Sequence, residues 1–173
     1  MNPEVIMIGL GYIGLPTAAL IASNKIPVLG VDINPKVVET INQGKIHIVE
    51  PDLDKEVEEA VKSGYLKAAL VAQEASTYLI VVPTPFKGKN EPDISFVEAA
   101  TKAIIPLLKE GDLYIIESTS PIGTTEKMME LIYAIRPELK GALHIAYCPE
   151  RVLPHSWDGL SCTCYILRFP KHM

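Results

Sequence analysis

Cysteine is scarce in this sequence, and the three that occur are poorly placed for a disulfide framework or a metal site. Cys148, Cys162 and Cys164 are an odd number, and the last two are separated by a single residue. This arrangement matches neither disulfide pairing nor the spacing of zinc ligands. The four histidines are scattered, at His47, His144, His155 and His172. We therefore predict no disulfide framework and no metal centre.

Long apolar runs and excess positive charge are also lacking. The 173 residues carry 16 Lys and Arg against 21 Asp and Glu, which gives a net charge of −5. No basic cluster interleaves with aromatic residues, which argues against a nucleic-acid surface. No apolar stretch approaches the length of a membrane span, and the N-terminus has no basic leader region. We expect a cytoplasmic protein with neither a nucleic-acid nor a membrane partner.

The most informative stretch present is residues 5–14, V-I-M-I-G-L-G-Y-I-G. A short apolar run enters a turn in which Gly9, Gly11 and Gly14 have G-x-G-x-x-G spacing, and a helix is expected over 13–21. In such a turn the first glycine allows the tight bend, the second lets the backbone approach a pyrophosphate, and the third lets the helix pack closely. The free N–H groups at the helix start would face the phosphates.

Asp32 ends the next apolar run, residues 27–31, about twenty residues beyond the glycines, where dinucleotide-binding domains place an acid. Its carboxylate can accept hydrogen bonds from both ribose hydroxyls of NAD and would repel the extra phosphate of NADP. The pattern therefore predicts NAD as the cofactor. The alternative is a glycine-rich turn of purely structural origin, with Asp32 as a solvated helix cap.

The order of elements predicts the fold class. Buried strands are expected at 77–82, 113–117 and 144–147 and a weaker one at 66–71; helices are expected at 53–62, 94–108 and 126–135, and a polar loop at 86–93. Hydrophobic residues make up 48% of the chain, enough for the core of one α/β domain. Strands alternating with helices indicate a Rossmann-like, doubly wound, mostly parallel sheet with helices on both faces.

Polar residues follow several of the expected strands. They are Asp32, Thr84, Ser118–Thr119 and Glu150. Carboxyl ends of parallel strands share one edge of the sheet, and ligands of open α/β sheets bind at that edge. The turn at 118–125 is rich in hydroxyls and precedes a helix, which favours an anionic or hydroxylic ligand. Ordinary N-capping by Thr124 or Thr125 is the alternative.

Four motifs together resemble the UDP-glucose/GDP-mannose dehydrogenase family. They are G-L-G-Y-I-G-L-P (9–16), V-P-T-P-F-K-G (82–88), E-S-T-S-P-I-G-T-T-E-K (117–127) and Y-C-P-E-R-V-L-P (147–154). The resemblance covers about residues 4–154 and is specific, because the motifs occur in order at suitable separations. It implies an enzyme that oxidises the C6 alcohol of a UDP-sugar to a carboxylate with two NAD+, through a thioester to a cysteine.

The resemblance also implies roles for individual residues. NAD contacts are expected at Gly9, Gly11, Tyr12, Ile13, Gly14, Asp32, Thr84 and Thr125, substrate contacts at Arg151 and Val152, and catalytic roles at Glu150 and Thr119. Glu150 would orient or deprotonate the hydrolytic water, close to Thr119. An ion pair is the alternative for Glu150, and a surface salt bridge for Arg151.

The resemblance ends near residue 154. We expect an NAD-binding domain over 1–154 and an unmatched tail over 155–173, which we attribute to a frameshift or an artificial alteration. The family's nucleophilic cysteine, lysine and asparagine follow in a second half. Cys162 and Cys164 lack the G-x-G-G-x-C context of that nucleophile, and Cys148 is expected to be buried.

Three readings of the function follow. The first is the cofactor half of a family enzyme, a homo-oligomer in its working form, with no turnover by these residues alone. The second is a non-catalytic NAD-binding module. The third is the cofactor domain of another NAD enzyme acting on hydroxyacyl or hydroxyacid substrates, against which the Pro-Thr-Pro and Glu-Ser-Thr motifs argue.

Overall fold

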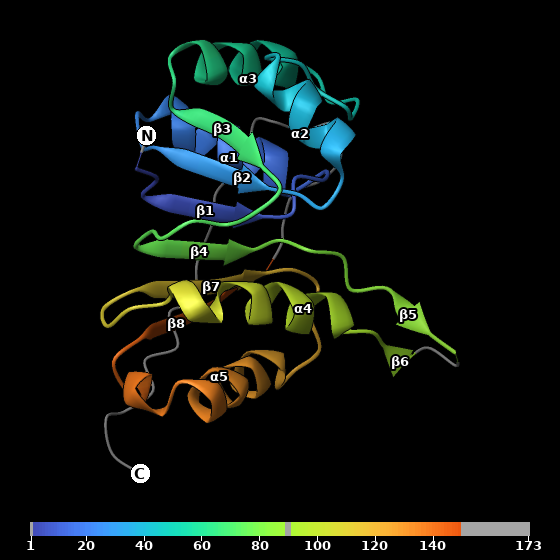
Figure 1. Ribbon diagram of the computed structural model, residues 1–173. Helices are drawn as coiled ribbons and strands as arrows, with labels where there is room; N and C mark the ends of the chain where they lie inside the picture. The colour runs from blue at the N-terminus through green and yellow to red at the C-terminus, as the bar shows by residue number, and fades with distance from the viewer. Residues whose placement is uncertain (1, 89–90, 150–173) are drawn as a thin grey trace.

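In the part of the chain that the structure describes, six short strands form one parallel sheet in the order β3-β2-β1-β4-β7-β8 (Figure 1). The computed structural model describes residues 2–88 and 91–149. The strands are β1 (Val5–Ile8), β2 (Val28–Val31), β3 (Leu66–Ala69), β4 (Thr77–Ile80), β7 (Leu113–Glu117) and β8 (His144–Cys148). The order reverses between β1 and β4, which pair from Val5↔Thr77 to Ile8↔Ile80. This reversal point is where doubly wound sheets bind dinucleotides.

Among the residues described, five helices and two short 3-10 turns connect the strands. They are α1 (Gly14–Ser23), α2 (Pro35–Asn42), α3 (Leu53–Lys62), α4 (Ser95–Ile104), η1 (Ile105–Leu107), α5 (Thr124–Ile135) and η2 (Pro137–Leu139). Figure 1 shows α2 and α3 at the β3 end of the sheet and α5 at the β8 end. No helix within 2–88 and 91–149 is both long and apolar enough to cross a membrane.

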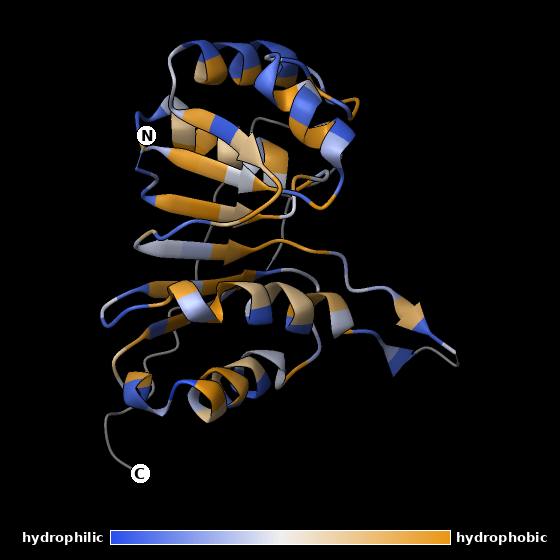
Figure 2. Cartoon of the chain, in the orientation of Figure 1, coloured by the Kyte–Doolittle hydropathy of each residue, from blue (hydrophilic) through white to orange (hydrophobic). Residues whose placement is uncertain are grey.

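The core is split into two layers by the alternation of side chains along the strands. In β1, Val5 and Met7 pack with α1 and α3, whereas Ile6 and Ile8 pack on the side of α4 and α5. Both faces are therefore apolar, and the strands are coloured mostly hydrophobic in Figure 2. Burial on both faces explains why these strands read as continuous apolar runs in the sequence.

The Rossmann-like fold class is confirmed, with small shifts at the element ends. Asn34 caps α2, because its Oδ1 accepts the Lys36 N–H at 3.0 Å and Pro35 follows it as the first helical residue. Helix α4 ends at Ile104, and the chain around Pro106 tightens into η1 because proline cannot continue the hydrogen-bond ladder.

The prediction of an irregular polar loop at 86–93 is wrong, because this segment contains two short paired strands. Phe86–Lys87 (β5) and Glu91–Pro92 (β6) pair antiparallel as a small hairpin that projects beyond the carboxyl ends of the strands (Figure 1). Asp93 holds its base. Its carboxylate pairs with Lys87 Nζ at 2.6 Å and accepts the Ser95 N–H at 3.0 Å. The Lys87 hydrogen bond, with those from Ser95, lowers the pKa of Asp93 to about 2.

A side-chain amide closes the outer edge of β3. Asn42 Nδ2 donates to the Ala68 carbonyl and Asn42 Oδ1 accepts the Ala68 N–H, both at 2.9 Å. The two bonds reproduce the pairing that a neighbouring strand would offer to Ala68.

Candidate functional site

Gly9 and Gly14 are fixed as glycines by the packing of the turn itself. Gly9 has a φ of +99°, and a Cβ there would lie 2.2 Å from the Val81 carbonyl oxygen. A Cβ on Gly14 would lie 1.9 Å from the Gly9 carbonyl oxygen. Any larger residue at either position would force backbone to move. The tight bend and the close approach of α1 therefore explain two of the three glycines.

Gly11 has no such internal reason. Its φ lies outside the left-handed region, and a Cβ there would meet no described atom within 4 Å. Gly11 is exposed at the start of α1, where the N–H groups of Gly11, Tyr12 and Ile13 have no acceptor among the described residues. Open space above unpaired donors at a helix start suits a pyrophosphate. The turn thus fits a dinucleotide by its own geometry.

Asp32 lies beside this turn because β1 and β2 are neighbours in the sheet. Its Oδ2 accepts the Leu10 N–H at 3.1 Å, and its Oδ1 accepts the Asn34 N–H at 2.9 Å. These bonds orient a half-buried carboxylate whose oxygens can each accept a further hydrogen bond. The cap of α2 is Asn34, so the reading of Asp32 as that helix's cap is wrong.

Tyr12 and Ile13 differ in how far they reach into solvent. The Tyr12 side chain is 59% exposed, whereas Ile13 is half-buried and packs against the core cluster under α1. Ile33, which follows Asp32, is 92% exposed. An apolar side chain standing in solvent beside Asp32 offers a surface for a flat aromatic group. Ile33 was missed from the sequence, where nothing distinguishes it from an apolar residue of the core.

Thr84 and the loop after β7 come together although 35 residues separate them. Thr84 Oγ1 donates to the Thr119 carbonyl oxygen at 2.8 Å, which ties the ends of β4 and β7. Ser118 is buried, and its hydroxyl pairs with the Ser120 hydroxyl. The structure therefore places Asp32, the glycine turn, Thr84 and Thr119 along one edge of the sheet, as the sequence predicts for strand ends.

Helix α5 begins two residues earlier than expected and without a side-chain cap. Gly123 is the N-cap residue, with a φ of +89°, and neither Thr124 nor Thr125 caps the helix. Thr124 Oγ1 instead donates to the Pro121 carbonyl at 2.8 Å, and Thr125 is buried. The N–H groups of Thr125 and Glu126 have no acceptor in the described part of the chain. The capping interpretation of these threonines is wrong.

Tyr147 is a contributor that the sequence did not single out. Its hydroxyl donates from β8 to the Ser118 carbonyl oxygen at 3.1 Å. A tyrosine in an apolar strand reads as a core residue, so no local signal could have found it. Cys148, beside it, is buried as expected.

Several predicted residues lie outside the described ranges. Glu150, Arg151 and Val152 belong to this group, as does the tail 155–173 with Cys162 and Cys164. Their expected roles stay predictions. Across 2–88 and 91–149, no group of three or more His, Cys, Asp or Glu side chains is placed to hold a metal ion.

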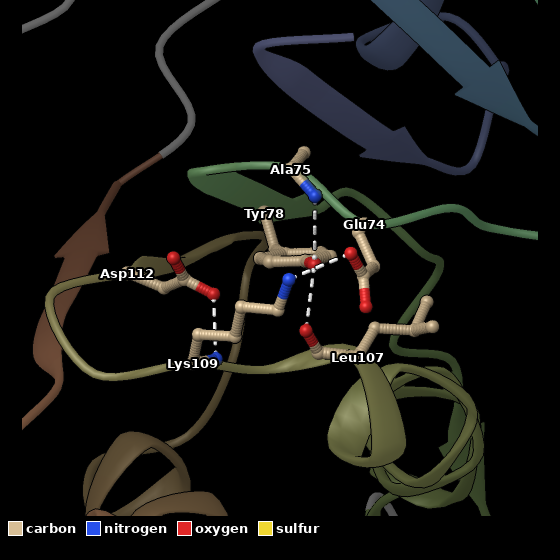
Figure 3. Close-up of polar contacts among 6 residues, drawn as sticks. All are labelled: Glu74, Ala75, Tyr78, Leu107, Lys109 and Asp112. Atoms are coloured by element: carbon tan, nitrogen blue, oxygen red, sulfur yellow. Dashed lines mark hydrogen bonds and ion pairs between the residues drawn. The ribbon is translucent and has the colours of Figure 1, made fainter. Parts of the chain in front are cut away.

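The opposite, amino edge of the sheet has a polar cluster of a different kind (Figure 3). The Tyr78 hydroxyl accepts the Ala75 N–H at 3.0 Å and donates to the Leu107 carbonyl at 3.4 Å. Lys109 donates through its backbone to Asp112 Oδ2 at 2.7 Å. Its Nζ pairs with Glu74 at 2.6 Å. Burial raises the pKa of both Tyr78 and Asp112.

Comparison with known proteins identifies a family. The model of the NAD binding domain of the UDP-glucose/GDP-mannose dehydrogenase family matches residues 3–157. UDP-N-acetyl-D-mannosamine dehydrogenase from Yersinia pestis is 59% identical over 156 residues, which cover 86% of this chain and 37% of that protein. NDP-N-acetyl-D-galactosaminuronic acid dehydrogenase from Ralstonia nicotianae is 53% identical with the same coverage.

Solved structures agree with these relatives. The structure of UDP-D-ManNAc dehydrogenase from Pyrococcus horikoshii superposes with a TM-score of 0.83 at 40% identity. The match covers 87% of this chain and 37% of that one. The 173-residue chain thus spans about 37% of the length of the relatives that it matches.

Proposed function

The chain belongs to the UDP-glucose/GDP-mannose dehydrogenase family, whose NAD-binding domain it contains, and we propose that it is the cofactor-binding part of a UDP-N-acetyl-D-mannosamine dehydrogenase. Such an enzyme oxidises the sugar C6 alcohol to a carboxylate, giving UDP-N-acetyl-D-mannosaminuronate. The chemistry supplied by bound NAD+ is acceptance of a hydride, twice per sugar.

The observation that carries the NAD site is Gly11. Packing accounts for Gly9 and Gly14, but a Cβ at Gly11 would meet no described atom within 4 Å. A ligand that approaches the backbone closely supplies the missing reason for a glycine there. Asp32, held by Leu10 and Asn34, would accept the hydroxyls of the adenosine ribose.

The remaining contacts follow from the order of the strands. With the pyrophosphate at the end of β1 and adenosine at β2, the nicotinamide half extends over β4 and β7. Tyr12 and Ile13 would flank the pyrophosphate, and Thr84 and Thr125 would contact the nicotinamide half. The Thr84 hydroxyl donates its hydrogen bond to the Thr119 carbonyl, so its oxygen can accept a hydrogen bond from the ligand.

We assign the chemical step to residues beyond the cofactor site. Glu150 would orient or deprotonate the water that cleaves the thioester, with Thr119 close to the same water. Arg151 and Val152 would contact the UDP-sugar. The thiolate that forms the thioester would come from the part of the relatives that this chain does not span.

The names of the relatives also bear on the identity of the substrate sugar. Several relatives between 54% and 59% identical are named for UDP-N-acetyl-D-mannosamine, which supports this substrate. A second candidate substrate is an N-acetylgalactosamine-derived sugar nucleotide, because the Ralstonia relative is named for such a sugar. We further infer that the working enzyme is a cytoplasmic homo-oligomer. Exposed apolar side chains such as Phe86 and Ile122 offer contact surface for its assembly. Light scattering on the working enzyme tests its oligomeric state.

Calorimetric titration with NAD+ and NADP+, followed by an NADH absorbance assay, tests the proposal. The 173-residue chain should bind NAD+ in preference to NADP+ and produce no NADH from UDP-N-acetyl-D-mannosamine. Fusing it to the C-terminal part of a relative should restore NADH production, more with this sugar than with UDP-N-acetyl-D-galactosamine. Absence of NAD+ binding would refute the cofactor site, and turnover by the chain alone would refute the assignment of the thiolate.

A further inference from the structure

The loop between β7 and α5, residues 118–123, has its carbonyl groups held by three hydroxyls from different parts of the chain. The Ser118 carbonyl accepts from Tyr147, the Thr119 carbonyl from Thr84, and the Pro121 carbonyl from Thr124. The donor–acceptor distances are 3.1, 2.8 and 2.8 Å. Three neighbouring carbonyls are thus turned toward protein donors.

Two donors that directly follow this loop are left without protein partners. The N–H groups of Thr125 and Glu126, at the start of α5, meet no acceptor among the residues described. With the loop carbonyls held by protein donors, these two N–H groups are available to a ligand beyond the strand ends. A ligand group that accepts hydrogen bonds, such as a ribose hydroxyl or a carboxamide oxygen, fits this surface.

The order of the strands identifies which part of a dinucleotide reaches this loop. Asp32 ends β2, the glycine turn ends β1, Thr84 follows β4, and Ser118 follows β7. A dinucleotide with its adenosine at Asp32 and its pyrophosphate at Gly11 therefore places its nicotinamide half over β4 and β7. This step rests on the proposed function.

We propose that Tyr147 is a positioning residue for the nicotinamide half of NAD. It lies on β8, beside Ile116 of β7, and its half-buried ring packs in the layer of α4 and α5. From there its hydroxyl reaches Ser118, whose carbonyl also accepts the Ser120 N–H at 2.8 Å. The hydroxyl fixes the first residue of the loop and does not itself touch the cofactor.

Tyr147→Phe tests the proposal because it removes one oxygen and keeps the ring. Calorimetry should show NAD+ binding weakened by roughly three- to tenfold, the effect of one hydrogen bond. Binding of ADP, which has the adenosine and pyrophosphate but no nicotinamide half, should be unchanged. The matched control is Tyr133→Phe on α5, since Tyr133 is half-buried and its hydroxyl has no hydrogen bond to a described residue; both ligands should bind it as they bind wild type.

The outcomes separate this inference from the function on which it rests. If wild type binds NAD+ and Tyr147→Phe binds both ligands unchanged, or loses both equally, Tyr147 is not a positioning residue. If wild type binds neither ligand, the cofactor site and this inference both fail.

Hydrogen exchange on the unmodified chain supplies a readout that does not depend on the variant's folding. Saturating NAD+ should slow exchange of the amides at residues 119–126 more than saturating ADP does. Equal protection by the two ligands would overturn the placement of this loop beside the nicotinamide half.

Discussion

The two edges of the parallel sheet differ in where their polar groups find partners. At the amino edge, Tyr78 bonds to Ala75, and Lys109 bonds to Asp112 and Glu74. These polar groups therefore find their partners within the protein (Figure 3). At the carboxyl edge, carbonyls are paired, but N–H groups around Gly11 and at the start of α5 are left without described acceptors. Polar groups that satisfy each other stabilise a fold, whereas oriented donors without partners are free to bind a ligand.

Both edges contain hydroxyls, charges and turns, so composition alone does not distinguish them. The difference lies in the hydrogen-bond inventory, which follows from the shared direction of the strands and of the helix starts. Substitutions at the two edges should therefore separate stability from binding.

The largest effects are expected from a pair of glycines within one turn. Gly14→Val places a Cβ against the Gly9 carbonyl and should cost more than about 3 kcal/mol of unfolding free energy. The Cβ of Gly11→Val meets no described atom within 4 Å, so its thermal midpoint should stay near wild type while NAD+ binding falls by at least about tenfold, or about 1.4 kcal/mol. Thermal denaturation and calorimetry measure the two quantities. Wild-type NAD+ affinity in Gly11→Val would leave the turn a structural feature only.

Asp32 is expected to determine the choice between NAD+ and NADP+ at the carboxyl edge. Its carboxylate should repel the additional phosphate of NADP+, so Asp32→Ala should narrow the preference for NAD+ by about tenfold to a hundredfold. Asp54→Ala, on the exposed surface of α3, removes the same charge and should leave the preference intact. Equal binding of NAD+ and NADP+ by wild type would remove Asp32 from this role.

Tyr78 tests the amino edge. Tyr78→Phe leaves the Ala75 N–H and the Leu107 carbonyl without the hydroxyl between them and should cost about 1–2 kcal/mol of unfolding free energy. NAD+ affinity should not change, because the cluster lies at the far end of the strands. Chemical denaturation and calorimetry on one preparation give both values. A loss of NAD+ affinity without a loss of stability would contradict the separation of the two edges.

The smallest effects are expected from two carboxylates whose pKa values move in opposite directions. The pKa of Asp93 is lowered to about 2 by Lys87, so its contribution is present above an unfolded value of about 3.9 and is lost as the pH falls toward 2. Burial raises the pKa of Asp112, so its ionisation opposes folding as the pH rises through the folded value.

Thermal midpoints of Asp93→Asn and Asp112→Asn, followed between pH 2 and pH 7, measure these opposite signs. Asp93→Asn should lose stability relative to wild type at neutral pH and approach it near pH 2. Asp112→Asn keeps an oxygen to accept the Lys109 N–H and should gain slightly at neutral pH. The same sign of pH dependence in both variants would contradict the assignment.

Sequence reasoning reached the sheet, its layers and the glycine turn because apolar runs and glycine spacing are local signals. It pointed to Asp32, which directly follows β2, and to Thr84, which lies shortly after the end of β4. The hairpin at 86–93 was not predicted, since strands of two residues, one of them with Pro92, are too short to show alternation of apolar and polar residues. The contacts of Thr84 with Thr119 and of Tyr147 with Ser118 depend on how separate strand ends align, over 35 and 29 residues, and no local pattern encodes them.

The pairing of Asn42 with Ala68 has a consequence for how this protein behaves at high concentration. An outer strand of a sheet is a template onto which another chain can add, and long exposed edges are a route to aggregation. On β3 the amide of Asn42 already occupies the N–H and carbonyl of Ala68, in the middle of a strand of four residues. A strand from another molecule must displace this side chain before it can pair with Ala68. A single residue of α2 therefore opposes fibril-like growth at the β3 edge.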